Sequence, residues 1–245
     1  MKKTTRTILF SILATIVIGY ALVAVVWLSH SPQDALCRHL YITIADSTER
    51  QYINEQEIRN YLLRTGLDVA DRPMHDIACH EIEKSLLQHD LIRTAECYKS
   101  PRHNLYVRVT QRVPAMYVVA NDGCYYVDTD RKIMPLRASV KADVPTFSGA
   151  VSRRAATEEY FDFAQWLSRN TYWEPRIESV VVYNPKNIVL TQKDMSAHIL
   201  LGSLDGYKDK MQKLNTLYTK GFDQIGYKPY REYDLRFNGQ VVGRY

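Results

Sequence analysis

Few residues in this sequence have the types and spacing that catalysis or metal binding needs. His80-Glu81 lacks a second histidine four residues later, so it does not form a zinc-binding helix motif. Ser203 directly follows Gly202 instead of lying midway between two glycines, which excludes a nucleophile elbow. The nearest approach to a metal cluster consists of His75, Cys79 and His80. The sequence therefore predicts a protein that is not an enzyme and has no cofactor, no metal and no small-molecule substrate.

The C-terminal end is rich in the side chains that dominate protein–protein interfaces. Aromatic residues alternate there with arginines: Tyr227, Tyr230, Arg231, Tyr233, Arg236, Phe237, Arg244 and Tyr245. A strand is expected from Glu232 to Val242, and the free edge of a sheet can receive a strand from another chain. The predicted docking residues are Tyr233, Leu235, Arg236, Phe237, Asn238, Gly239, Gln240, Val241 and Val242.

Two other interpretations of this C-terminal stretch remain open. It can be an ordinary final strand, in which core and solvent residues alternate. Alternatively, Asn238-Gly239 can make a tight hairpin that folds the strand back on itself and shortens the docking edge.

Charge is distributed in a way that excludes a nucleic-acid binder. The chain has 245 residues and a formal net charge of +5, from 32 basic and 27 acidic side chains. Three of the basic residues precede residue 29, where no acidic residue occurs, so the remainder of the chain has 29 basic and 27 acidic residues. Phosphate recognition needs basic charge concentrated on one face. At 46% hydrophobic residues, the chain should instead bury a substantial core.

Residues 8–28 form an apolar segment without a charged side chain. The segment runs from Ile8 to Leu28, and a helix of this length spans about the 30 Å of a bilayer's hydrocarbon layer. A cleaved signal peptide would have a shorter apolar region and a small-x-small site, which Trp27-Leu28-Ser29-His30 does not provide. Basic residues precede the span, so residues 1–7 are expected in the cytoplasm and everything after residue 29 outside it.

An extracytoplasmic compartment would permit disulfides among the four cysteines. Cys37, Cys79, Cys97 and Cys124 allow three sets of pairings. Four separate thiols are an equally good interpretation, because a domain of this size does not need cross-links for stability.

After a juxtamembrane segment, residues 29–38, the pattern predicts a first domain over residues 39–112. Period-two alternation indicates a strand at residues 40–44, and Asn54 with Glu57 can cap a helix. Asp76 can cap a second helix with Ala78, Ile82, Leu86 and His89 on its buried side. Strands at residues 92–99 and 105–110 complete the order β-α-α-β-β.

This order directly after a membrane anchor resembles a POTRA domain, and particular motifs resemble the POTRA domain of the bacterial FtsQ/DivIB family. The motifs are Met74-x-Asp76-Ile77, Ile82-Glu83-x-x-Leu86, Ile92-x-x-Ala95-Glu96-Cys97, Asn104-Leu105-x-Val107-x-Val109 and Gln111-Arg112-x-Pro114-Ala115. The family usually has a glutamate where this chain has Gln111.

Residues 113–245 predict a second, β-rich domain with helices, so the fold class is α+β. A hairpin is expected at residues 116–127, a helix at 156–168, and strands at 177–183, 187–192 and 197–202. Asp205 can cap the last helix, whose inward row is Tyr207, Met211, Leu214 and Tyr218. Leu201-Gly202, Lys210, Leu214 and Asp234-Leu235-Arg236-Phe237 resemble the C-terminal signature of the same family.

The resemblance implies a non-enzymatic scaffold of the cell-division machinery. It implies a single-pass protein of the bacterial inner membrane, enriched at the septum, with its bulk in the periplasm. The last strand and the helix before it would bind the bitopic proteins FtsB and FtsL. The POTRA domain and the transmembrane helix would contact other membrane proteins of the divisome.

Two residues depart from the family pattern at this surface. Arg236 and Phe237 resemble the family's interface anchors, but Phe237 replaces a tyrosine, and Ser203 stands where members carry an arginine. The alternative function is a POTRA-containing component of a secretion or envelope-assembly system, although such a chain normally carries a C-terminal membrane barrel. A membrane-anchored envelope hydrolase is a third hypothesis.

Overall fold

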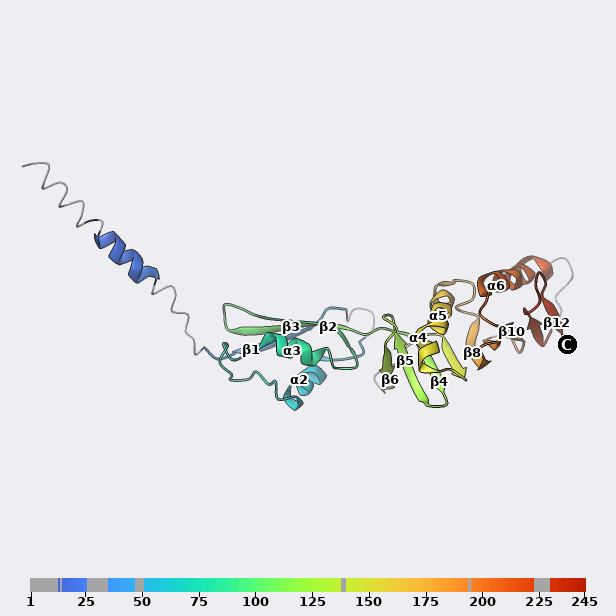
Figure 1. Cartoon of the computed structure of the whole chain (residues 1–245), viewed down its shortest axis with the longest axis horizontal. Helices are drawn as coiled ribbons and strands as arrows, with labels where there is room; N and C mark the ends of the chain where they lie inside the picture. The colour runs from blue at the N-terminus through green and yellow to red at the C-terminus, as the bar shows by residue number, and fades with distance from the viewer. Residues whose placement is uncertain are drawn as a thin grey trace, which may run out of the picture. The chain divides into compact units, whose positions relative to one another are not determined.

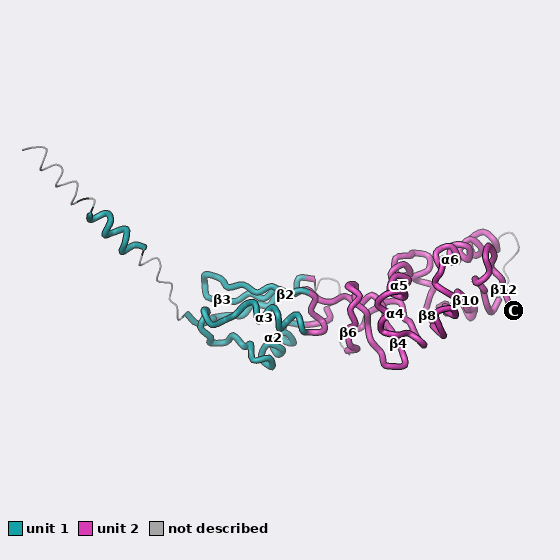
Figure 2. The backbone as a smooth tube through the Cα atoms, viewed as in Figure 1, with its two compact units in different colours: residues 1–45, 54–88, 94–109 teal, residues 46–53, 89–93, 110–245 magenta. Residues whose placement is uncertain are grey.

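The computed structural model describes residues 13, 15–25, 35–46, 51–137, 140–193, 195–222 and 230–245. The chain divides into two compact units (Figure 2). Unit 1 comprises residues 1–45, 54–88 and 94–109, and unit 2 comprises residues 46–53, 89–93 and 110–245. Unit 2 therefore includes two short segments, residues 46–53 and 89–93, that come before its main portion, residues 110–245.

Residues 15–25 are helical, and nearly all their side chains are exposed. Within the described ranges, no helix combines the length and the apolar character needed to cross a bilayer. Ile8 and Leu28, the ends of the predicted span, lie outside the described residues.

Unit 1 is built around a three-stranded sheet with two helices. The strands are β1 (His39–Ile44), β2 (Ile92–Lys99) and β3 (Asn104–Gln111), in the order β1-β3-β2, and β1 runs parallel to β3. The helices α2 (Glu55–Arg64) and α3 (Cys79–Leu86) lie on the same side of this sheet (Figure 1). The predicted β-α-α-β-β order is confirmed.

The two helices of unit 1 begin differently. Asn54 caps α2 by accepting a hydrogen bond from the Glu57 amide at 2.8 Å, as predicted. The predicted cap at Asp76 is wrong, because the Asp76 amide closes a turn with the Pro73 carbonyl and the helix begins only at Cys79. Ala78, the observed N-cap, is exposed and makes no side-chain cap hydrogen bond.

The core of unit 1 forms where one face of each helix meets alternate residues of β3. Strand residues of period two and helix residues spaced by four bring these side chains onto facing surfaces. They are Ile58, Leu62, Ile82, Leu86, Leu105, Val107 and Val109, all buried.

Unit 2 contains a mixed sheet of nine strands among its described residues, in the order β12-β11-β10-β9-β8-β7-β4-β5-β6. The strands are β4 (Pro114–Ala120), β5 (Gly123–Asp128), β6 (Ile133–Pro135), β7 (Thr146–Gly149), β8 (Ile177–Asn184), β9 (Asn187–Gln192), β10 (His198–Gly202), β11 (Glu232–Asp234) and β12 (Val242–Arg244). The predicted strands at 116–120, 177–183, 187–192 and 197–202 are confirmed with small differences at their ends. The observed folds of both units are consistent with the α+β class.

Helices of unit 2 pack on its sheet (Figure 1). They are α4 (Arg153–Thr157), α5 (Glu159–Arg169) and α6 (Tyr207–Thr216), which continues as the π-helical segment η1 (Leu217–Gly221). The single helix predicted at 156–168 is wrong, because Glu158 leaves helical geometry at φ −110° and ψ −94° and separates α4 from α5. The predicted inward residues of α5, Tyr160, Phe163, Ala164 and Leu167, are all buried.

The helix α6 starts without the predicted aspartate cap. Gly206 is its N-cap, and the Asp205 carboxylate instead accepts a hydrogen bond from the Ser203 hydroxyl at 2.8 Å. Met211 and Leu214 of the predicted inward row are buried, and Tyr207 and Tyr218 pack partly buried against the same core.

Buried polar groups fix the start of unit 2. The Gln111 side-chain oxygen accepts hydrogen bonds from the amides of Tyr52 (2.6 Å) and Ile53 (3.2 Å). Arg112 donates to Asp128 at 2.7 Å in a nearly buried ion pair. Gln111 thus supplies the acceptor oxygen that a glutamate would supply, so the departure from the family pattern keeps this function of the side chain.

Candidate docking edge at the C-terminal end of the sheet

The C-terminal residues form two short strands, not the single strand predicted from Glu232 to Val242. β11 pairs in parallel with β10, so that Ile199 lies opposite Tyr233, and it pairs in antiparallel fashion with β12, so that Tyr233 lies opposite Gly243. β11 is therefore an internal strand. β12 is the last strand of the sheet order, and no described strand pairs with its outer side.

The chain reverses direction between β11 and β12, and Asn238-Gly239 lies within the connection of residues 235–241. The strand does fold back as in the hairpin interpretation, but through a longer connection than the predicted tight turn. Asn238 and Gly239 both lie in a turn, and Gly239 has a φ of 82°, which favours glycine. A continuous strand is excluded because this backbone geometry turns residues 242–244 back along β11.

The nine predicted docking residues consequently have different environments. Tyr233 and Leu235 are buried in the core of unit 2. Val242 belongs to the edge strand itself. The remaining residues connect the two strands: Arg236, Phe237, Asn238, Gly239, Gln240 and Val241. Only part of the predicted surface is thus available to a partner.

A buried carboxylate organises the loop. Asp234 accepts hydrogen bonds from Arg236 through Nε (2.9 Å) and Nη2 (2.6 Å), and from Arg244 Nη2 (3.1 Å). The hydrogen bonds from Arg236 hold the pKa of Asp234 below its ordinary value, against the opposing effect of burial. The bidentate contact shows that Arg236, predicted as an interface anchor, is engaged within its own chain.

The turn between β10 and α6 is shaped to receive Arg236. Gly202 has a φ of 75°, and a Cβ at this position would lie 2.7 Å from Arg236 Cγ. Lys210 donates to the carbonyl oxygens of Leu201 (3.1 Å) and Ser203 (2.8 Å) on either side of the glycine. Three family motifs that are separate in the sequence therefore form one cluster: Leu201-Gly202, Lys210 and the segment that contains Arg236. This cluster holds the end of the sheet in place.

Aromatic side chains remain exposed around this cluster. Phe237 is 46% exposed and Tyr245 is 76% exposed. The Tyr245 ring contacts that of Tyr230, with 4.8 Å between centroids, and Tyr230 packs against Gly243 of β12. Large aromatic groups beside an edge strand are typical of protein-binding surfaces. Tyr227, also noted in the sequence, lies outside the described residues.

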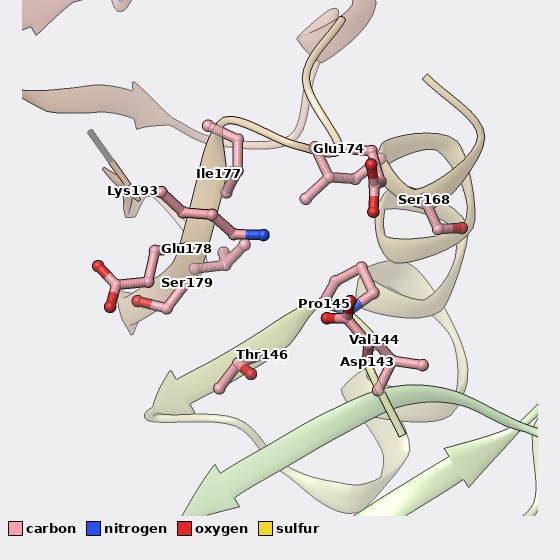
Figure 3. Close-up of a pocket in the computed structure, with 12 residues that line it drawn as sticks. Asp143, Val144, Pro145, Thr146, Ser168, Glu174, Ile177, Glu178, Ser179 and Lys193 are labelled. Atoms are coloured by element: carbon pink, nitrogen blue, oxygen red, sulfur yellow. The ribbon is translucent and has the colours of Figure 1, made fainter. Parts of the chain in front are cut away.

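Unit 2 also has a cavity of about 210 Å³ near the start of β7 and β8. Lys193, Glu174, Glu178 and Asp143 contribute its charged groups, and Figure 3 shows Lys193 and Glu174 on different walls. The Ser179 hydroxyl in this cavity is hydrogen-bonded to Thr191 at 2.7 Å rather than to a histidine or carboxylate base. Across the described ranges, no group of three or more His, Cys, Asp or Glu residues could hold a metal ion.

Comparison with protein families identifies two matching regions of the chain. Residues 113–244 match the family model described as FtsQ/DivIB, C-terminal related, which covers more than half of the sequence. The chain belongs to the FtsQ/DivIB family. Residues 35–110 match the POTRA-like domain model. No curated protein matches the chain.

FtsQ/DivIB proteins are non-enzymatic scaffolds of cell division, and they interact with other proteins of the divisome. For this FtsQ/DivIB protein, the sequence missed the structural roles of Asp234 and Arg244. A signal was available for Asp234, because an aspartate side chain can accept a hydrogen bond from the amide two residues later, as Asp234 does from the Arg236 amide at 3.1 Å. The pairing of Arg244 with Asp234 depends on the hairpin register, which the sequence left open.

Proposed function

We propose that this chain is a single-pass scaffold of the bacterial inner membrane that binds FtsB- and FtsL-like bitopic proteins through the edge strand β12. The position of β12 at the end of the sheet order carries the proposal. A guest strand would hydrogen-bond to the backbone of Val242–Arg244, in the manner of β-strand addition.

The length of β12 limits what the backbone alone can contribute. Three residues offer few main-chain hydrogen bonds, each with a net value of about 1 kcal/mol. Side-chain contacts must therefore provide much of the affinity, and the exposed rings of Phe237 and Tyr245 are the best placed to do so. Phe237 acts here through apolar contact, since it has no phenolic oxygen.

The membrane segment and the POTRA domain would provide the protein's location and its further contacts. The apolar segment of residues 8–28 would anchor the protein, with residues 1–7 in the cytoplasm and residues 29–245 in the periplasm. The POTRA domain and the membrane segment would contact other divisome membrane proteins. Enrichment at the septum would follow from these contacts.

Capture of the partner by the full-length protein tests the docking edge. We expect Phe237→Ala combined with Tyr245→Ala to reduce co-purification of the FtsB-like partner at least tenfold. Tyr183→Ala is the matched control, because Tyr183 is a 63% exposed tyrosine on the internal strand β8. A photocrosslinking residue at position 245 should attach to the partner, whereas one at position 183 should not. Undiminished capture by the double variant would reject β12 as the docking edge.

A further inference from the structure

Two of the four cysteines lie next to each other in unit 1. Cys79, at the start of α3, is a near neighbour of the Cys97 thiol on β2 and contributes to raising the pKa of that thiol. Cys37 Sγ instead contacts the His39 carbonyl oxygen, and the exposed Cys124 interacts with Tyr117 in unit 2. All four are thiols in the structure.

An independent backbone contact holds this pair of cysteines in place. The Cys97 amide donates to Glu83 Oε1 at 2.7 Å. Glu83 lies four residues after Cys79 on α3, hence on the same helix face. The strand β2 is therefore held at Cys97 against the side of α3 that carries Cys79.

We propose that Cys79 and Cys97 form a disulfide that joins α3 to β2 when the chain is folded outside the cytoplasm. The proposal rests on the proposed function only for the compartment, because disulfides persist in oxidising compartments and are rare in the cytosol. β2 ends the sheet order β1-β3-β2, so the bond would secure an edge strand of the POTRA domain.

The two thiols have different access to an oxidant. Cys97 is buried, whereas Cys79 is partly exposed. Burial raises the pKa of the Cys97 thiol, and the neighbouring Cys79 raises this pKa further. Cys97 is thus the less reactive thiol, and exchange should begin at Cys79.

The reaction is a thiol–disulfide exchange with a disulfide-bearing oxidoreductase as the oxidant. The Cys79 thiolate attacks that disulfide, forming a mixed disulfide and releasing one oxidoreductase thiolate. Cys97 then loses its proton and attacks the Cys79 sulfur, which expels the second oxidoreductase thiolate. Two electrons and two protons pass from the cysteine pair to the oxidoreductase, which is left as a dithiol.

Mass tagging of the full-length protein in acid-quenched cells tests the disulfide. A denatured sample should take up two maleimide tags before reduction and four after reduction. Cys79→Ser or Cys97→Ser should expose all three remaining thiols without reduction. Cys124→Ser is the matched control and should leave one taggable thiol. Peptide mass spectrometry should identify the bond between Cys79 and Cys97, and pairing of either with Cys37 or Cys124 would overturn the proposal.

Labelling of the exposed Cys124 shows whether a negative result comes from the absence of the disulfide or from a wrong location of the chain. A membrane-impermeant maleimide should label Cys124 in intact spheroplasts. If Cys124 is labelled but Cys79 and Cys97 are both free thiols, the disulfide is rejected and the location stands. If Cys124 is labelled only after lysis, the proposed location is wrong, and the disulfide in cells is rejected with it.

Thermal unfolding gives a second readout. The bond would close a loop of about 18 residues, so reduction should lower the Tm of the unit 1 transition by about 10 °C. The variant carrying both Cys79→Ser and Cys97→Ser should show no change on reduction. An equal response of the wild type and this variant to reduction would contradict a bond at this pair.

Discussion

Gly202 lies directly against the aliphatic part of Arg236, so that a Cβ at position 202 would be 2.7 Å from Arg236 Cγ. The two residues are far apart in sequence and come together because β10 and β11 are neighbouring strands. The glycine leaves room for the arginine stem, and the guanidinium then reaches Asp234. The conformation of the loop beside the candidate docking edge therefore depends on the absence of a side chain at Gly202 on the neighbouring strand β10.

Gly202→Ala should destabilise unit 2 by about 2 kcal/mol, since it places a side chain in a left-handed conformation and forces Arg236 to move. Chemical denaturation monitored by tryptophan fluorescence measures this loss, because Trp173 is buried in the same unit.

Gly239→Ala provides the control for backbone strain alone. Gly239 has a similar φ of 82°, but a Cβ added at this position would have no heavy atom within 4 Å. Its substitution should cost about 1 kcal/mol. Equal losses for the two variants would show that the contact between Gly202 and Arg236 contributes nothing to stability.

Asp234 should make unit 2 sensitive to acid. Its pKa is lowered in the folded state, chiefly by the hydrogen bonds from Arg236, so the unfolded chain binds protons more readily. The resulting stabilisation is present above about pH 4, the ordinary range of an aspartate pKa, and is lost as the pH falls toward the lowered value. Asp234→Asn should therefore cost about 2 kcal/mol at pH 7.

The pH profile distinguishes this effect from a simple loss of packing. The difference in free energy of unfolding between the wild type and Asp234→Asn should shrink below about pH 4, because protonation of the wild-type carboxyl weakens the same contacts. Urea titrations from about pH 7 to about pH 2.5 measure it. A difference that stays constant over this range would argue against the ionised carboxylate as its cause.

Local patterns in the sequence were sufficient to predict most elements of both units. The Asn54 cap is confirmed because its partner, the Glu57 amide, is three residues away. The Asp205 cap is wrong because the Asp205 carboxylate accepts a hydrogen bond from the Ser203 hydroxyl, two residues earlier, and none from the first amides of α6. Local chemistry thus identifies candidates for a cap but does not decide between competing partners.

The strand arrangement of the candidate docking edge was harder to predict because it depends on long-range pairing. A strand and a hairpin at Asn238-Gly239 were both compatible with the sequence, and the choice depends on the pairing of β11 with β10 and β12. The burial of Tyr233 follows from the same pairing. Composition predicted that this region is rich in the residue types found at interfaces. It could not distinguish residues that are buried in the sheet, such as Tyr233, from residues that stay exposed, such as Phe237 and Tyr245.

Gln111→Ala should destabilise unit 2 by about 2 kcal/mol, because it leaves the buried amides of Tyr52 and Ile53 without their acceptor. Gln56→Ala is the control, since Gln56 forms an exposed hydrogen bond with Asn60 on α2 and should cost less than about 0.5 kcal/mol. Denaturant midpoints of the full-length protein measure both. Similar small losses would show that the Gln111 amide is not needed at the start of unit 2.

Partner capture by Asp234→Asn should separate positioning from direct contact at the docking edge. The Asp234 side chain is fully buried and cannot touch a partner, yet it holds Arg236 and Arg244 in place. If Arg236 acts by shaping the loop, Asp234→Asn and Arg236→Ala should weaken capture of the FtsB-like partner to a similar extent. Their combination should then cost little more than either alone, because both remove the same contact.

Binding of the full-length variants to the immobilised partner measures these effects at a temperature where each variant remains folded. Arg154→Ala is the control, since Arg154 forms an exposed ion pair with Glu158 elsewhere in unit 2. If Asp234→Asn binds normally while Arg236→Ala does not, Arg236 contacts the partner directly. The bidentate contact with Asp234 would then have to open on binding, and the affinity of wild type would include the cost of breaking it.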